Sequence, residues 1–160
     1  MNVLNKINKN IIKVNKEDLV TIVKYKIKMF EDANLIHLLE DDPFNTILIK
    51  YQKLYDDEKA THLLIKENNQ IIAICGCFIK DEIPYCFYKE NYGFIGDMYT
   101  LPDYRGKGHA KALLEKSLEW FQNINIIQLL ADKNVKHIYE KFGFIDNDYL
   151  MEMNLNNFNL

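Results

Sequence analysis

About two thirds of the way along the chain, two glycines separated by one residue alternate with basic side chains. The segment reads Arg105-Gly106-Lys107-Gly108-His109-Ala110. An anion held at a turn needs several backbone N–H groups that point the same way, and only small residues let the backbone approach closely. The glycines and the alanine give that access, and the arginine and lysine add positive charge. The segment therefore predicts an anion site, best matched to a pyrophosphate backed by a helix dipole.

The segment does not match the sequence patterns of two other kinds of phosphate-binding turn. A Walker A loop needs a Gly-Lys-Ser/Thr ending, and a dinucleotide fold needs three glycines directly after its first strand. A glycine pair also suits a plain tight helix start. The order of helices and strands around the segment distinguishes between these alternatives.

Apolar periodicity and turn residues predict an α/β fold with a mixed sheet in a single domain spanning 1–160. We expect helices over 16–30, 43–56, 108–121 and 134–142, the first capped by Asn15. We expect strands over 10–14, 62–66, 70–79, 94–100, 126–131, 144–146 and 149–155. The Asn-rich connection 67–69 favours a hairpin, and the apolar run 126–131 suits a strand buried on both faces. The glycine turn then lies between a strand and a helix.

In this context the stretch 97–110 resembles the central motif of the GCN5-related N-acetyltransferases (the GNAT superfamily): Arg or Gln, two residues, Gly, one residue, then Gly or Ala. Downstream, Ile138-Tyr139-Glu140-Lys141-Phe142-Gly143-Phe144 resembles the second motif of that family, a short helix ending in Tyr-Glu-Lys-hydrophobic-Gly-Phe. The resemblance covers 94–144 well and, by element order, most of the chain. It implies a GNAT-like, mostly antiparallel central sheet flanked by helices, with acetyl-CoA as cosubstrate.

The resemblance also implies which residues bind acetyl-CoA. In the family, free backbone groups of the fourth strand pair with the pantetheine arm, and the glycine turn binds the pyrophosphate. The residues carried over are Met98, Tyr99, Thr100, Arg105, Gly106, Lys107, Gly108, His109 and Ala110.

Two residues are candidates for the chemistry. Tyr139 lies where the family often places the phenol that protonates the departing thiolate, although it could instead pack in the core beside Phe142. Asp97 could accept a proton from the amine, or bind a protonated amine through water; the alternative is a hydrogen-bonded carboxylate at a strand end. Asp132 stands where the family frequently has an asparagine that contacts the pantetheine.

The function implied is transfer of an acetyl group from acetyl-CoA to an amine of a small molecule or peptide. The alternative of another class is a non-catalytic module that binds or senses acyl-CoA, and a third reading is a nucleotide-phosphate binder that uses the same turn. The aromatic segment 83–93 could favour an aromatic or cationic acceptor, form a lid, or serve as a homodimer contact.

Composition excludes several classes. A formal net charge of −3 argues against nucleic acid as a partner. Acidic runs such as 40–42 and 56–58 could attract a cationic amine or simply be solvated. Cys75, Cys77 and Cys86 lack the spacing of a zinc site, and His37 and His62 have no second ligand nearby in sequence, so no metal is expected. With no apolar run of roughly 20 residues and a polar segment 1–10, we expect a cytoplasmic protein that does not contact a membrane.

Overall fold

The sheet of this computed structural model has five strands in the order β1-β2-β3-β4-β5. The structure describes residues 11–81 and 91–146. Neighbouring strands from β1 to β4 are antiparallel, and β5 runs parallel to β4. The mixed, mostly antiparallel sheet predicted from the sequence is thus confirmed. The strands are β1 (Ile11–Lys13), β2 (Ala60–Glu67), β3 (Gln70–Asp81), β4 (Asn91–Thr100) and β5 (Ile127–Leu129).

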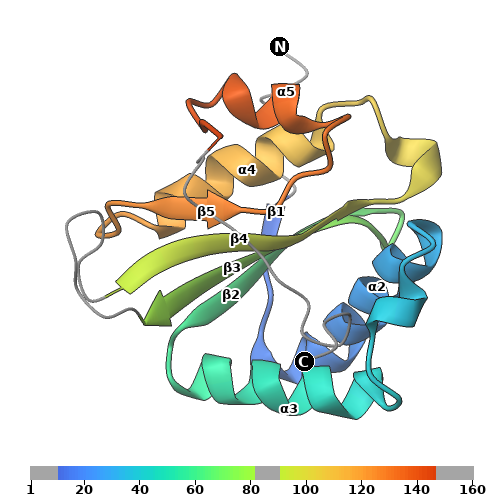
Figure 1. Cartoon of the computed structure of the whole chain (residues 1–160). Helices are drawn as coiled ribbons and strands as arrows, with labels where there is room; N and C mark the ends of the chain where they lie inside the picture. Colours follow the sequence, from blue (N-terminus) through green and yellow to red (C-terminus); the bar gives the residue numbers. More distant parts are fainter. Residues whose placement is uncertain (1–10, 82–90, 147–160) are drawn as a thin grey trace, which may run out of the picture. The chain divides into compact units, whose positions relative to one another are not determined.

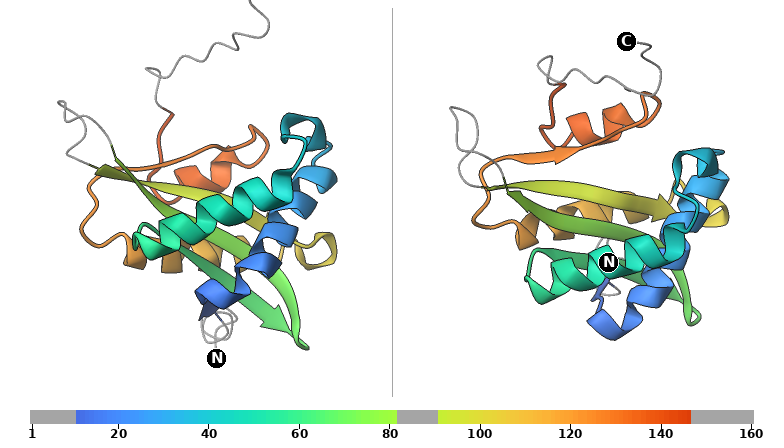
Figure 2. Two further views of the ribbon diagram at one scale, coloured as in Figure 1. Left: turned by 90° about the horizontal axis from the view of Figure 1, so that it is seen from below. Right: turned by 60° about the horizontal axis from the view of Figure 1, so that its bottom comes forward.

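The chain divides into two compact units, Met1–Leu130 and Ala131–Leu160, which are described separately. In the first unit, α4 covers one face of the sheet, and α2 and α3 lie beside each other on the opposite face (Figures 1 and 2). The helical elements of this unit are η1 (Lys16–Asp18), α2 (Leu19–Asp32), η2 (Ile36–Leu38), α3 (Pro43–Asp56), η3 (Pro102–Tyr104) and α4 (His109–Trp120).

The helices form where apolar residues recur on one face. Leu19, Ile22 and Val23 of α2 are buried, as are Leu113 and Leu114 of α4. Helix α3 begins at its proline, and the side chain of the preceding aspartate accepts a hydrogen bond from a backbone N–H of the first turn. The predicted bounds of α3 are confirmed. The predicted first helix instead begins as the short 3₁₀ segment η1, and the side chain of Asn15 makes no capping hydrogen bond.

The predicted hairpin between β2 and β3 is confirmed, and its turn explains why asparagines stand there. Asn68 and Asn69 both have positive φ, at 49° and 63°. Consecutive left-handed residues form the turn whose twist matches that of two antiparallel strands, and asparagine tolerates this conformation better than most residues. The turn thereby sets the register of β2 against β3.

Two predictions about the strands were wrong. The run 126–131 is not a strand buried on both faces: β5 is short and half-buried, and Leu130 is 77% exposed. The physical reason is that, among the residues that the structure describes, β5 pairs with β4 alone and over only three positions. Residues 144–146 form no strand. The predicted strand 149–155, the thiol of Cys86 and most of the aromatic segment 83–93 lie outside the described residues.

The second unit contains the short helix α5 (Lys136–Glu140). It is shorter than the predicted 134–142. Gly143 has a φ of 88°, so a glycine in the left-handed conformation follows the helix, as its sequence predicted. Lys136 and Asp146 form an ion pair of 2.8 Å within this unit.

Candidate functional site

The glycine turn connects the end of β4 to the start of α4. Gly106 and Gly108 have φ values of 74° and 86°, a region that other residues enter only at a cost. Gly108 is also the residue that caps α4, and its carbonyl accepts the first helical hydrogen bond, from Ala112 N–H (3.0 Å). A Cβ placed on Gly106 would meet no atom within 4 Å. The turn is therefore open above the backbone and lies against the positive end of a helix.

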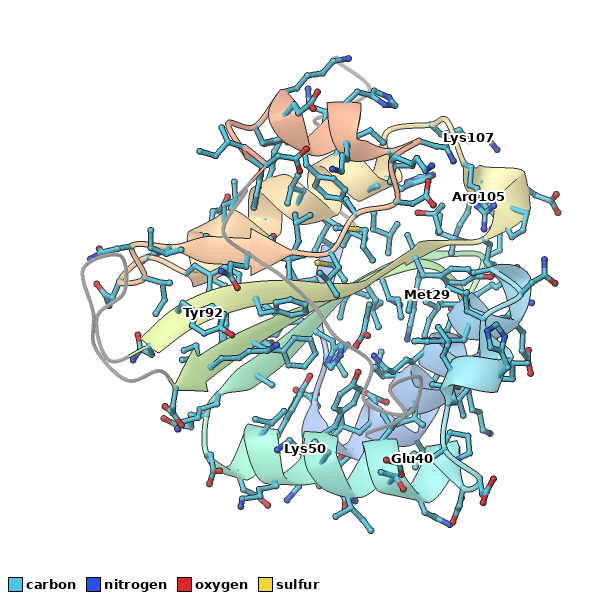
Figure 3. The ribbon with its side chains drawn as sticks, viewed as in Figure 1. Met29, Glu40, Lys50, Tyr92, Arg105 and Lys107 are labelled. Carbon is cyan, nitrogen blue, oxygen red and sulfur yellow. The ribbon has the colours of Figure 1, made fainter. Side chains whose placement is uncertain are left out.

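Arg105 and Lys107 are exposed and anchored to backbone carbonyls near the turn (Figure 3). Arg105 Nε donates to the carbonyl of Thr100 at 3.0 Å, and Lys107 Nζ donates to the carbonyl of Asp103 at 3.0 Å. Both contacts hold the basic side chains close to the turn while leaving them accessible to an anion. The predicted basic rim of the turn is present in the structure.

His109 and Ala110 begin α4, and both are half-buried. The Nδ1 atom of His109 is buried and finds no hydrogen-bond partner among the described residues. Burial lowers the pKa of His109, and the nearby charge of Lys107 acts in the same direction, against an opposing effect of Glu67. The neutral imidazole is therefore favoured, so His109 adds little fixed charge to the turn near pH 7.

Strand β4 contains a bulge at Asp97 and Met98. In the register of β3 against β4, Ile74 pairs with Tyr99 and Gly76 with Gly96, so one residue of β3 faces two of β4. Asp97 has a φ of 52°. The left-handed conformation costs an ordinary residue about 1–2 kcal/mol, although aspartate adopts it more readily than most. Bulges of this kind redirect a strand and its side chains, and they often lie beside active sites.

Beyond the bulge, one edge of β4 is open. The parallel pairing of β4 with β5 spans only Gly93–Ile95 against Ile127–Leu129. In the described part of the chain, no strand continues that pairing along Met98, Tyr99 and Thr100. Backbone groups on this edge are available to an extended ligand, as at the edge of any sheet. The short helix η3 joins this edge to the glycine turn, so the nine predicted cofactor residues belong to the end of β4 and to the turn that follows it in the chain.

The carboxylate of Asp97 is surrounded by donors. Oδ1 accepts from the ammonium of Lys26 on α2, and Oδ2 accepts from the hydroxyl of Tyr51 on α3 and from Nε2 of His62 on β2, the last at 3.1 Å. The side chain of Asp97 is 1% exposed and that of His62 fully buried. A buried charge persists only if it is paired and hydrogen-bonded, and this carboxylate is both.

These contacts decide the ionisation of Asp97. Burial alone would raise the pKa of Asp97, but the hydrogen bond from His62 and the positive charge of Lys26 outweigh it and hold the pKa well below its usual range. Burial and the neighbouring carboxylate raise the pKa of Tyr51 well above its usual value. Asp97 is therefore ionised near neutral pH, and Tyr51 stays a neutral donor.

A second link joins α2 to β4 closer to the turn. The hydroxyl of Tyr99 donates to the carboxylate of Asp32, the last residue of α2. That hydrogen bond lowers the pKa of Asp32, whereas burial and the same contact raise the pKa of Tyr99. The open edge of β4 is thus fastened to α2 at two places, through Asp97 and through Tyr99.

Tyr139 lies in the second unit, on α5, and is half-buried. Its ring contacts that of Phe144 edge-on, with centroids 6.1 Å apart. In the same unit, the carboxylate of Asp132 accepts a hydrogen bond from the backbone N–H of Asn134 at 2.8 Å, which begins the turn that leads into the helix. Asp132 therefore has a local structural partner at the position where the GNAT motif frequently has asparagine.

A sequence model of the acetyltransferase (GNAT) family matches residues 27–144. That stretch takes in strands β2 to β5, the glycine turn and α5. The chain belongs to the acetyltransferase (GNAT) family. Acetyl transfer is the general activity that this membership supports.

Solved structures agree with the family. A protein from Clostridium acetobutylicum, described as a "predicted acetyltransferase with acetyl-CoA", is 28% identical with a TM-score of 0.84, over 93% of this chain and 97% of that one. A GCN5-related N-acetyltransferase from Ralstonia eutropha JMP134 is 17% identical with a TM-score of 0.75 (89% and 96% covered). An aminoglycoside antibiotic 6'-N-acetyltransferase from Acinetobacter haemolyticus is 21% identical with a TM-score of 0.68 (91% and 97% covered). The last two show a shared fold. No curated protein sequence matches this chain at a significant level.

Two features are absent from the described residues of this GNAT protein. No group of three or more His, Cys, Asp or Glu side chains there could hold a metal ion. No helix there is long and apolar enough to cross a membrane.

In this GNAT protein, Asp97, its three donors and Tyr55, whose hydroxyl lies 3.0 Å from Nδ1 of His62, form what we call the Asp97 cluster. The sequence did not identify the four partners of Asp97 in this cluster. Lys26, Tyr51 and Tyr55 looked like ordinary helix residues, and His62 was considered only as a metal ligand. The acidic runs also have structural partners: Asp42 caps α3, and Asp56 pairs with Lys16 at 2.5 Å. A buried polar residue within the apolar strand 60–65 was the one signal that could have identified His62, because such a residue needs a partner.

The low pKa of Asp97 predicts a pH dependence of folding stability. A carboxylate whose pKa is lower in the folded than in the unfolded state stabilises the fold above its unfolded pKa, about 3.9, and loses that contribution as pH falls below it. Asp97→Asn, which preserves the side-chain shape, should be less stable than wild type at pH 7, and the difference should shrink as pH falls from about 4 to 2. Urea unfolding across pH 2–7 measures this.

The matched control for this experiment is Asp56→Asn, which removes a carboxylate from an exposed ion pair. Exposed pairs contribute little to stability, so its effect should be within about 1 kcal/mol and should vary little with pH. Equal pH dependence in Asp97→Asn and wild type would show that the Asp97 carboxylate does not differ in pKa between the two states.

Proposed function

We propose that the protein transfers an acetyl group from acetyl-CoA to an amine of a small molecule or a peptide. The observation that carries the proposal is a glycine turn at the start of α4 that follows an open edge of β4, in a chain that belongs to the GNAT family. A similar protein that was solved with acetyl-CoA supports this choice of donor. Free buried thiols at Cys75 and Cys77 are consistent with the cytoplasmic location included in the proposal.

In this proposal the pyrophosphate of acetyl-CoA lies against the turn 105–110, where backbone N–H groups, the helix dipole and two basic side chains meet. The pantetheine arm then extends along Met98, Tyr99 and Thr100 and pairs with their backbone. The thioester comes to lie near the bulge, where β4 leaves β5. Binding in this way holds the thioester in one place, which is the main contribution that an enzyme makes to a direct displacement.

The chemical step in the proposal is attack of a neutral amine on the thioester carbonyl. A carbon–nitrogen bond forms and the carbon–sulfur bond breaks. The amine gives up one proton, which passes to solvent water, and the departing thiolate gains one, which solvent water returns to the group that donated it. Tyr139 is the proposed donor to the thiolate. Asp97 is proposed to act on the acceptor side, as a carboxylate that binds positive charge. Its lowered pKa makes it a poor proton acceptor, and because its side chain is 1% exposed it acts on the acceptor side through the ammonium of Lys26, which it binds.

The first test is release of coenzyme A, measured with a thiol reagent, from acetyl-CoA and a panel of primary amines that includes aminosugars, polyamines and peptide N-termini. We expect at least one amine to raise the rate above that of acetyl-CoA hydrolysis and to gain one acetyl group by mass. Tight acetyl-CoA binding without transfer to any amine would instead indicate the non-catalytic acyl-CoA-binding module. Protection against heat by ATP but not by acetyl-CoA would indicate a nucleotide-phosphate site.

Gly106→Ala tests the pyrophosphate position. The added methyl would meet no protein atom within 4 Å, so its cost to stability is the strain of the positive φ, about 1–2 kcal/mol. If phosphates occupy that open space, affinity for acetyl-CoA should fall about tenfold or more, measured by calorimetry. Gly143→Ala is the matched control, because Gly143 also has a positive φ and open surroundings. Equal affinities for the two variants would place the pyrophosphate elsewhere.

Tyr139→Phe tests the proton donor. Loss of a general acid typically costs about 10²–10⁴-fold in turnover, so kcat should fall by about 100-fold while the dissociation constant of acetyl-CoA changes by less than about threefold. Tyr25→Phe serves as a control, since the Tyr25 hydroxyl donates to the backbone carbonyl of Ile71 (2.8 Å) and its loss should affect stability more than turnover. Unchanged kcat in Tyr139→Phe across pH 6–9 would remove Tyr139 as the acid.

A further inference from the structure

His62 reaches Asp97 across a strand that has no side chain in the way. His62 of β2 pairs with Gly76 of β3, and Gly76 pairs in turn with Gly96 of β4, next to Asp97. A Cβ on Gly76 would lie 3.0 Å from Oδ2 of Asp97 and 2.7 Å from the ring of Phe78. Glycine at this position therefore opens the space through which the imidazole and the carboxylate meet.

Tyr55 determines which nitrogen of His62 carries the proton. The hydroxyl of Tyr55 accepts a hydrogen bond from the backbone N–H of His62 at 2.9 Å, so its own proton can be donated to Nδ1, 3.0 Å away. With Nδ1 as acceptor, Nε2 carries a proton and donates it to Asp97. The rings of Tyr51, Tyr55 and Phe78 also pack around the imidazole and fix its orientation.

The bulge of β4 depends on these contacts. Asp97 is the one non-glycine residue of β4 with a positive φ, and its side chain ties the bulge to α2, α3 and β2. A slip of one residue in a strand turns every following side chain and every following backbone group to the other side. The position of Asp97 therefore sets which backbone groups of Met98, Tyr99 and Thr100 face the open edge.

We propose that His62 is a positioning residue for acetyl transfer: by donating from Nε2 to Asp97, with Tyr55 orienting the ring, it holds the β4 bulge in the conformation that places the thioester. The inference rests on the proposed function, because it assigns the open edge of β4 to the pantetheine arm. His62 is too deeply buried to contact substrate and acts through Asp97 alone. Tyr55 acts one step further away, through His62.

The position of the donor group distinguishes this role from a merely structural one. His62→Gln can place an amide N–H near the position of Nε2, whereas His62→Asn has its amide near the position of Nδ1 and leaves Asp97 without that donor. His62→Phe keeps an aromatic ring and has no donor. A histidine needed only to fill the core would be replaced best by phenylalanine, and a positioning histidine best by glutamine.

The experiment compares kcat and the acetyl-CoA dissociation constant of these three variants with wild type, well below each melting temperature. We expect kcat to fall about tenfold or more in His62→Asn and His62→Phe, since small misplacements of a reacting group are costly in rate. His62→Gln should stay within about threefold of wild type. Affinity for acetyl-CoA should change by less than about threefold in all three, because the glycine turn is untouched. Wild-type kcat in His62→Phe, or no advantage of Gln over Asn, would overturn the proposal.

Two further variants keep the test decisive if the His62 variants do not fold. Tyr55→Phe leaves the imidazole in place and removes the group that orients it, so kcat should fall in the same direction as in His62→Asn. Ile22→Val removes one core methylene and none of the hydrogen-bonding groups around Asp97, so it should lose stability and keep wild-type kcat. Equal kcat in Tyr55→Phe and Ile22→Val would overturn the proposal.

Hydrogen exchange separates failure of this inference from failure of the proposed function. The backbone amides of Met98 and Tyr99 can be followed in the free protein, with no acceptor amine present. We expect their exchange to be at least about tenfold faster in Tyr55→Phe than in wild type, with little change in β1 and β2. Unchanged exchange would contradict the role of His62 even if wild type transfers acetyl groups. Faster exchange together with no acetyl transfer by wild type would contradict the proposed function instead.

Discussion

The structure around β4 depends on one buried carboxylate that has to be satisfied. Asp97 adopts a left-handed conformation and carries a negative charge in the interior, and both are unfavourable by themselves. Its three donors come from α2, α3 and β2. The two helices on that face of the sheet, and strand β2 on the other side of β3, are therefore fixed relative to the bulge. The arrangement of the helices and the bend in the strand thus depend on the same hydrogen bonds to Asp97.

That constraint accounts for residue choices that apolar packing does not explain. Glycine at position 76 leaves room for a polar contact to cross the sheet, and aromatic rings pack around the imidazole of His62. Burial strengthens each hydrogen bond in the cluster and raises the cost of leaving any one of them unmade. The cluster is therefore suited to holding a single backbone conformation.

The sequence predicted the glycine turn well and the Asp97 cluster poorly, for a physical reason. The turn is built from six consecutive residues, so composition and spacing are enough to recognise it. The donors of Asp97 lie 71, 46 and 35 residues away along the chain, and no local pattern joins them. The same difference explains β5, where an apolar run predicted a strand but not that it would pair along only three positions.

The glycine turn and the Asp97 cluster also differ in how strongly substitutions elsewhere in the protein affect them. The turn binds its proposed ligand mostly through backbone groups, so changes elsewhere leave it intact. The cluster ties the open edge of β4 to Lys26 and Tyr51, on the two helices that cover this face of the sheet. If the acceptor binds among these helices, changes in them that alter acceptor recognition also alter the support of the bulge. Specificity for the acceptor and placement of the thioester would then be coupled through Asp97, whereas affinity for the donor would remain independent.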